Sequence, residues 1–297
     1  MSLGRRILLF PLTLLLIAAA LLAGSAIAIF AILGAFKLPT GPLTRESVLA
    51  GCALFTFVIV GRLIERRTFA ELGFGRGFLR DMGIGLALGA GIISLVIGLL
   101  ALFGWYQVIG PGALAGAGIV TNLSVVLLFL LVALFEEIAF RGLLFRIVEN
   151  GLGSWGALLV SAVFFGGAHL GNPGATLGSS IAIALEAGVL LGAIYMATRS
   201  LWMVIGVHWA WNYFEGPVFG TQVSGYDIPS LLHSVTDGPV LWTGGAFGPE
   251  AGLFAVIVGG IVGAIFIWLA IRRGRVIAPL WARRATMLPA QPSTAAS

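Results

Sequence analysis

The chain has little charge and almost no cysteine, and each shortage excludes a class of protein. Charged residues make up 10% of the 297 residues and hydrophobic residues 59%, with a mean hydropathy of +1.06. A soluble protein of this length needs a more strongly charged surface, so the composition predicts a helical membrane protein. The single cysteine, Cys52, excludes a disulfide within the chain and a thiolate metal cluster.

The apolar segments are continuous rather than alternating, which excludes a porin-like barrel. A membrane-spanning helix needs about 20 apolar residues. We therefore predict an all-α fold, a polytopic transmembrane helical bundle of about eight spans. The predicted spans are residues 7–33, 47–64, 82–103, 123–145, 155–170, 181–198, 201–219 and 252–271.

The basic residues cluster at the ends of these spans, so they indicate membrane topology and not a nucleic-acid partner. With the N-terminus in the cytoplasm, nearly all arginines fall on the inner side, and we predict that both termini are cytoplasmic. Residues 1–284 are predicted to form one transmembrane domain with a catalytic core at about 121–219, followed by a disordered cytoplasmic tail, 285–297. The outer loops hold mainly acids: Glu46, Glu215, Asp227, Asp237 and Glu250.

Two adjacent glutamates, Glu136 and Glu137, lie inside an apolar run, where a charge costs a few kcal/mol. On a helix, Glu137 and Arg141 are i,i+4 neighbours and can pair. Glu136 points about 100° away, so it lacks that partner and suits a general base or acid. The alternative is a buried ion network that only fixes helix packing.

Two further apolar runs carry one histidine each. Phe165 and His169 share one helix face, and His208 and Asn212 share another. A lone buried histidine is usually a core residue, but two of them with an amide and an unpaired acid favour a site. His233, in an outer loop, is assigned no role.

These groups allow two routes to hydrolysis. Glu136, His169 and His208 could supply three ligands to one divalent metal ion, such as an open catalytic zinc whose bound water is activated. Alternatively, without a metal, Glu136 and His169 activate water while His208 and Asn212 stabilise the oxyanion. The sequence lacks the Gly-x-Ser-x-Gly and His-Glu-x-x-His motifs of other hydrolases.

Three motifs occur in order between about 125 and 214: Glu-Glu-x-x-x-Arg, Phe-x-x-x-His and His-x-x-x-Asn. This region resembles the CAAX-protease and bacteriocin-processing (CPBP, or ABI) family of intramembrane proteases, and the outer segment with residues 223–225 and 243–250 looks like a bacterial subgroup. The resemblance implies an endopeptidase, often called a metalloprotease, in the bacterial cytoplasmic membrane. Its substrate would be a membrane-associated, CAAX-like protein or peptide. Its implied site residues are Glu136, Glu137, Arg141, His169, His208 and Asn212.

Other interpretations stay open at this point. The same buried groups could serve a proton-coupled transporter, or a catalytically silent membrane binding or immunity protein. Glu186, in the predicted span 181–198, is expected to bond to a backbone group or to pair with Arg141. The loop 215–248 is long, rich in glycine and proline, and could cap the bundle.

Overall fold

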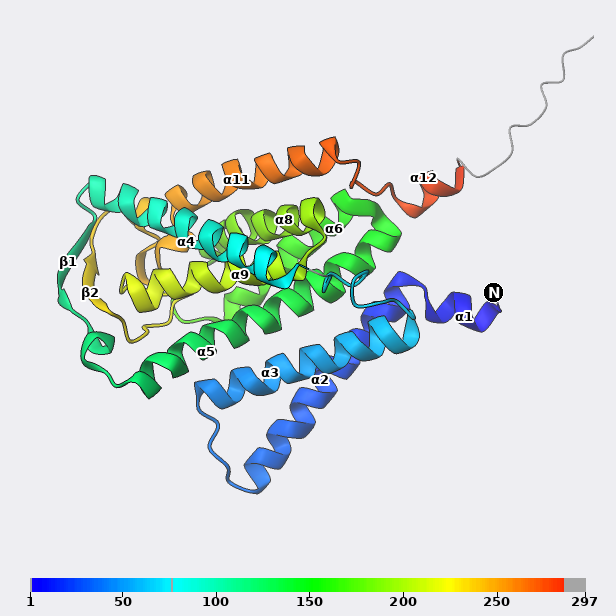
Figure 1. Cartoon of the computed structure of the whole chain (residues 1–297), viewed down its shortest axis with the longest axis horizontal. Coiled ribbons are helices and arrows are strands. Elements are labelled where there is room, and N and C mark those ends of the chain that lie inside the picture. Colours follow the sequence, from blue (N-terminus) through cyan, green and yellow to red (C-terminus); the bar gives the residue numbers. More distant parts are fainter. Residues whose placement is uncertain (1, 76, 286–297) are drawn as a thin grey trace, which may run out of the picture.

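A computed structural model describes residues 2–75 and 77–285 of the chain as a bundle of helices, which confirms the predicted all-α polytopic fold (Figure 1). The predicted tail, 285–297, lies outside the described residues except for Ala285. The α-helices are α1 Leu3–Leu8, α2 Pro11–Ala35, α3 Pro42–Phe57, α4 Phe78–Leu102, α5 Ile119–Glu137, α6 Arg146–Ala168, α7 Leu177–Ile183, α8 Leu190–Thr198, α9 Leu201–Tyr213, α10 Val240–Thr243, α11 Leu253–Arg272 and α12 Leu280–Ala285.

Among the described residues, six helical stretches are long and apolar enough to cross a membrane. One of them, Ile119–Gly171, is 53 residues long and contains two of the predicted spans. The helix axis breaks between these two at Gly153, whose φ is 73°. The predicted span 201–219 is not one of the six, so the number eight stays a prediction.

Within residues 2–75 and 77–285, four π-helical turns interrupt the long helices: η1 Val58–Ile64, η3 Ile138–Phe145, η5 Ala184–Val189 and η6 Phe214–Val218. A π turn adds a residue to the helical turn and so changes which carbonyl groups are free to accept other donors. Such turns are frequent at functional sites. Two of them, η3 and η5, face each other next to the glutamate pair.

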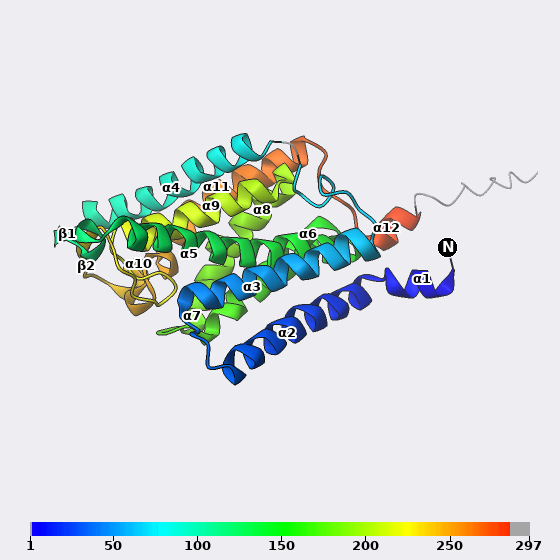
Figure 2. The ribbon, with the colours of Figure 1, turned by 60° about the horizontal axis from the view of Figure 1, so that its bottom comes forward.

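The bundle has two different ends (Figures 1 and 2). The described N-terminal residues and α12 lie at one end, where Arg199 binds Glu149 at 2.5 Å and the carbonyl of Arg275 at 2.6 Å. A small antiparallel sheet of β1, Tyr106–Pro111, and β2, Leu232–Thr236, lies at the other. Sequence analysis missed this sheet. Its second strand belongs to the 215–248 loop, which therefore covers that end.

Helices α4 and α9 pack so closely that glycine is required between them. A Cβ atom at Gly89 would lie 2.1 Å from the carbonyl oxygen of Val207, one residue before His208. Small residues allow this kind of backbone approach in membrane helices. The position of His208 therefore depends on a glycine in a helix that contributes no polar group to the site.

We expect Gly89→Ala to destabilise the protein by about 1–3 kcal/mol, because α4 and α9 must move apart. Thermal unfolding in detergent measures the change. The matched control is Gly91→Ala on the same helix, where an added Cβ meets nothing within 4 Å. Equal unfolding temperatures for the two variants would contradict the close contact.

Candidate active site

The carboxylate of Glu137 lies at the centre of a fully buried polar cluster. Its Oε1 accepts from Arg141 Nη1 at 2.8 Å and from His208 Nδ1 at 2.8 Å. Glu137 is the last residue of α5, and Arg141 follows one turn later in η3, as the i,i+4 spacing predicted. One acid thus neutralises the arginine and orients the imidazole.

Arg141 also ties α5 to the π-helical turn η5. Its Nη2 donates to the carbonyl oxygens of Ala187 and Gly188 at 3.0 and 3.2 Å, and its guanidinium lies 4.5 Å from the ring centre of Phe165. Glu186, expected either to bond to a backbone group or to pair with Arg141, interacts with that guanidinium electrostatically but makes no hydrogen bond with it, because the guanidinium binds the carbonyls of the two next residues. Spacing along the sequence could not show this, since the π turn determines which carbonyls are presented.

His169 lies at the end of α6, in the short turn His169–Gly171. Its Nδ1 lies 2.7 Å from the carbonyl oxygen of Phe165, one turn earlier. Because a carbonyl only accepts, Nδ1 carries the proton and Nε2 is left as an acceptor in the neutral ring. Gly166 lets α7 approach, since a Cβ there would lie 2.3 Å from the carbonyl oxygen of Ser180.

Phe165 connects the three motifs. Its ring centre lies 4.8 Å from that of His169 and 6.1 Å from that of His208, and Arg141 lies over its face. The phenylalanine therefore fixes both imidazoles relative to the buried ion pair. This contact explains why an aromatic residue precedes His169 by one turn.

Helix α9 brings His208 and Asn212 to the same place. The chain turns at Arg199, which has a φ of 57°, and the hydroxyl of Ser200 then caps the helix by accepting from the amide of Met203 at 3.3 Å. His208 and Asn212 lie one turn apart on the face toward α5.

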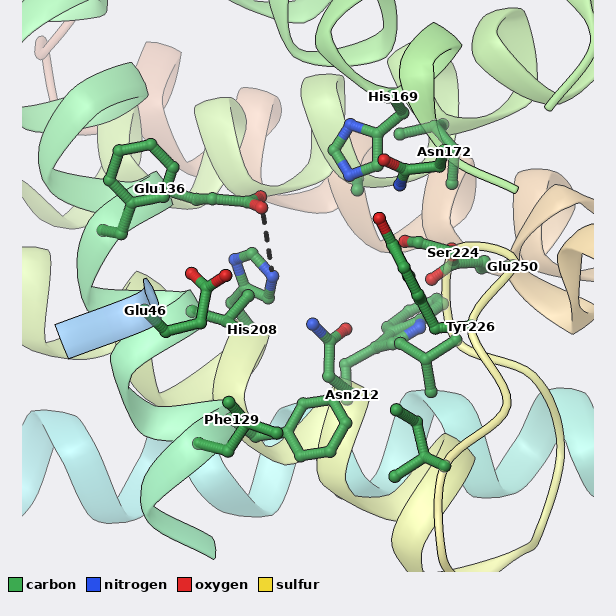
Figure 3. A pocket seen from close by; sticks show the side chains of 18 of the residues that line it. Glu46, Phe129, Glu136, His169, Asn172, His208, Asn212, Ser224, Tyr226 and Glu250 are labelled. Carbon is green, nitrogen blue, oxygen red and sulfur yellow. Dashed lines mark hydrogen bonds and ion pairs between the residues drawn. The ribbon is translucent and has the colours of Figure 1, made fainter. Parts of the chain in front are cut away.

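The site surrounds a cavity of about 550 Å³ (Figure 3). Glu136, His169, His208 and Asn212 all line it. The Oε2 of Glu136 lies 3.9 Å from His208 Nε2 and makes no hydrogen bond. These four of the six predicted site residues therefore share one cavity. The remaining two, Glu137 and Arg141, are completely buried behind it.

Sequence analysis missed several polar residues of the cavity. They come from the start of α3, the turn after α6, π turn η5 and the segment that follows η6, and they include Glu46, Asn172, Glu186, Ser224, Tyr226 and Glu250 (Figure 3). Glu250 lies in a Gly-Pro-Glu-Ala-Gly segment just before α11, and this short acidic interruption beside a span was the available signal.

Two acids expected in outer loops are in fact buried. Glu215 is 0% exposed and accepts from Trp211 Nε1 at 3.1 Å and from the amide of Glu250 at 3.1 Å. Burial raises the pKa of Glu250, although a hydrogen bond from the hydroxyl of Ser224 at 2.6 Å opposes this. Burial therefore favours the neutral acid at Glu250.

The predicted metal ligands do not fit a three-ligand site as they are placed. In the described part of the chain, no group of three His, Cys, Asp or Glu side chains is arranged to hold a metal ion. Glu136, His169 and His208 share a cavity, and each imidazole is held through Nδ1 by Phe165 or Glu137, which leaves Nε2 as its second nitrogen. We therefore derive no reaction step through a metal.

Comparison with known proteins gives one match. Residues 118–214, about a third of the chain, match the family model described as type II CAAX prenyl endopeptidase Rce1-like. The range runs from the start of α5 to just past Asn212 and so contains all three motifs. No curated protein and no solved structure matches.

Proposed function

We propose that the chain is an intramembrane endopeptidase that uses water activated by Glu136 and His169, and the match of residues 118–214 to the Rce1-like family model supports this. The observation that carries this proposal is the cavity shared by Glu136, His169, His208 and Asn212 inside a membrane bundle. Its substrate is a membrane-associated protein or peptide, reached from within the lipid bilayer.

The first step is activation of the water. A neutral His169 with its proton on Nδ1 can accept one water hydrogen at Nε2, and the unbonded carboxylate of Glu136 can accept the other. With both hydrogens directed at acceptors, a lone pair of the water is free to attack the carbonyl carbon. Glu136 takes the proton as the new C–O bond forms.

The second step is stabilisation of the oxyanion. When protonated, His208 donates through Nδ1 to Glu137 and through Nε2 toward the cavity. The amide of Asn212 supplies a second donor one turn later. Two fixed donors aimed at the developing charge are the usual means of stabilising a tetrahedral intermediate. The buried Glu137–Arg141 pair positions His208 and touches no reacting atom.

The last step returns the proton. Glu136, now a neutral acid, donates its proton to the leaving nitrogen as the C–N bond breaks, so one product has a new carboxyl group and the other a new amine. The carboxylate of Glu136 is regenerated for the next water.

The function is tested with purified protein in proteoliposomes and a library of synthetic peptides that each carry one apolar anchoring segment, including prenylated peptides ending in a CAAX motif. Mass spectrometry of the products should show defined cleavage sites. Flux of a solute without any cleavage would favour the transporter interpretation and overturn the proposal.

We expect a chelator to leave the rate of cleavage unchanged, because the proposed mechanism has no metal ligand set. Metal analysis of the purified protein and a zinc add-back series accompany the assay. Loss of activity with the chelator that zinc restores would show that Glu136, His169 and His208 rearrange to bind a metal, as in the alternative route.

We also propose a position in the cell: a multi-pass protein of the bacterial cytoplasmic membrane with both termini in the cytoplasm. The arginine-rich end, which includes α12, supports this orientation. A protease-accessibility assay on tags at each terminus tests it. Tags that are cut from outside intact cells would reverse the orientation.

A further inference from the structure

The wall of the active-site cavity carries many more acids than bases. Among the described residues that line it, Arg45 is the single lysine or arginine, and it lies 3.7 Å from Glu46, already beside an acid. The carboxyl groups that face the cavity belong to Glu46, Glu136, Glu186, Asp227 and Glu250. Glu136 has its role in water activation, so the others need a different explanation.

Glu186 is a buried acid of the cavity that the proposed mechanism does not use. It is 1% exposed and lines the cavity, yet its Oε2 has no hydrogen-bond partner in the structure. Arg141 interacts with Glu186 electrostatically but makes no hydrogen bond with it, because its Nη1 and Nη2 donate to Glu137 and to backbone carbonyls. An unpaired buried carboxyl is costly, so a donor from a bound molecule would be strongly favoured there.

Glu250 faces the same part of the cavity. It is 3% exposed, and its Oε1 is held by the hydroxyl of Ser224 at 2.6 Å. Glu186 and Glu250 both line the cavity together with His169, so like charges on the two acids would repel each other there. Figure 3 shows Glu250 and Ser224 on the side of His169, across the cavity from Glu136.

We propose that Glu186 and Glu250 form an acidic subsite that binds the cationic side chain of a lysine or arginine close to the scissile bond. The inference rests on the proposed peptidase function of the same cavity. It assigns a substrate class that the family match does not give.

The chemistry of the cavity suits such a side chain. Apolar residues such as Leu190 and Ile183 line the route beside Glu186 and can contact the aliphatic stem, while the charged head reaches the carboxyls. Hydrogen bonds between a cation and a carboxylate are about twice as strong as neutral ones. A bound cation also compensates the negative charge of the two carboxylates, which burial otherwise disfavours.

The same wall disfavours a free C-terminal carboxylate near the scissile bond. That group would add negative charge beside Glu186 and Glu250, with Arg45 as the one cation on the wall and Glu46 beside it. We therefore expect cleavage at an internal, basic position of the substrate.

The experiment uses one peptide library in two ways. The library carries an apolar anchor followed by a randomised segment. The full-length Glu136→Gln variant is immobilised in detergent as a non-cleaving trap, and the captured peptides are sequenced. The wild type is then given the same library, and cleavage sites are mapped.

We expect lysine and arginine to be enriched at least about 10-fold at one position among captured peptides, a difference of about 1.4 kcal/mol in binding. Glu186→Gln and Glu250→Gln, added singly and together to the trap, should reduce the enrichment to about 2-fold or less. Glu71→Gln, an exposed acid outside the cavity, is the matched control and should leave it intact.

Capture without basic enrichment, or enrichment that survives both substitutions, would overturn the subsite. If a Gln variant fails to fold, Ser224→Ala provides a second test: it removes the hydrogen bond that positions the Glu250 carboxyl and favours its charged form, so it should also lower the enrichment. Basic capture with no cleavage by the wild type supports the subsite and defeats the peptidase proposal. Cleavage at sites without basic residues supports the peptidase proposal and defeats the subsite.

Discussion

Glu136→Gln is expected to lower kcat/KM for peptide hydrolysis by about 10²–10⁴-fold, the usual contribution of a general base. The amide has the same size as the carboxyl group, so the cavity keeps its shape, but the amide cannot take a proton from water. The 3.9 Å contact with His208 Nε2 and the absence of other bonds mean that little packing is lost. Cleavage of the best library peptide by proteoliposomes measures the effect.

The control for this prediction is again Glu71→Gln, which removes an acid that binds only Thr68, near the surface. Both variants should unfold at temperatures close to that of the wild type. Full activity in Glu136→Gln would end its assignment as the base. A collapse of stability without a specific loss of rate would instead support the packing interpretation of the glutamate pair.

Arg141→Met is expected to destabilise the protein by about 3–5 kcal/mol, because it leaves Glu137 as a buried charge without its main partner. The substitution also removes two hydrogen bonds to η5 and the contact with the Phe165 ring. Thermal unfolding in detergent should show a large drop in the midpoint temperature.

The double variant Glu137→Gln/Arg141→Met separates stability from catalysis. Replacing both partners of a buried ion pair costs far less than breaking it, so much of the stability should return. Activity should stay low, because His208 loses the carboxylate that its Nδ1 contacts at 2.8 Å. A double variant that is fully active would show that the pair does not position His208.

The contacts within a single helix were predictable, because the regular helix repeat determines which nearby residues share a face. The i,i+4 spacings placed Arg141 against Glu137 and Asn212 on the face of His208, and the structure agrees on both. The family resemblance, carried by the same three motifs, is confirmed over residues 118–214.

The rest depended on contacts between distant segments and on departures from the regular helix. The carbonyls that bind Arg141 lie in a π turn, which the 3.6-residue repeat cannot reveal. Glu250 reaches the cavity from a loop far along the chain, and Glu215 is buried by Trp211 and the Glu250 backbone. The short strands β1 and β2 pair across more than a hundred positions of the chain, Tyr106 with Thr236 at one end and Pro111 with Leu232 at the other.

For the proposed peptidase, the unequal ends of the bundle would determine where cleavage products leave. The cavity reaches from Glu136 to the start of α3 and the segment 223–229, on the side of the sheet and away from α12. A soluble fragment cut from an anchored protein would therefore be released into the compartment that the sheet faces. In the orientation proposed above, that compartment is outside the cell, so this chain would act on proteins after export and not during their synthesis.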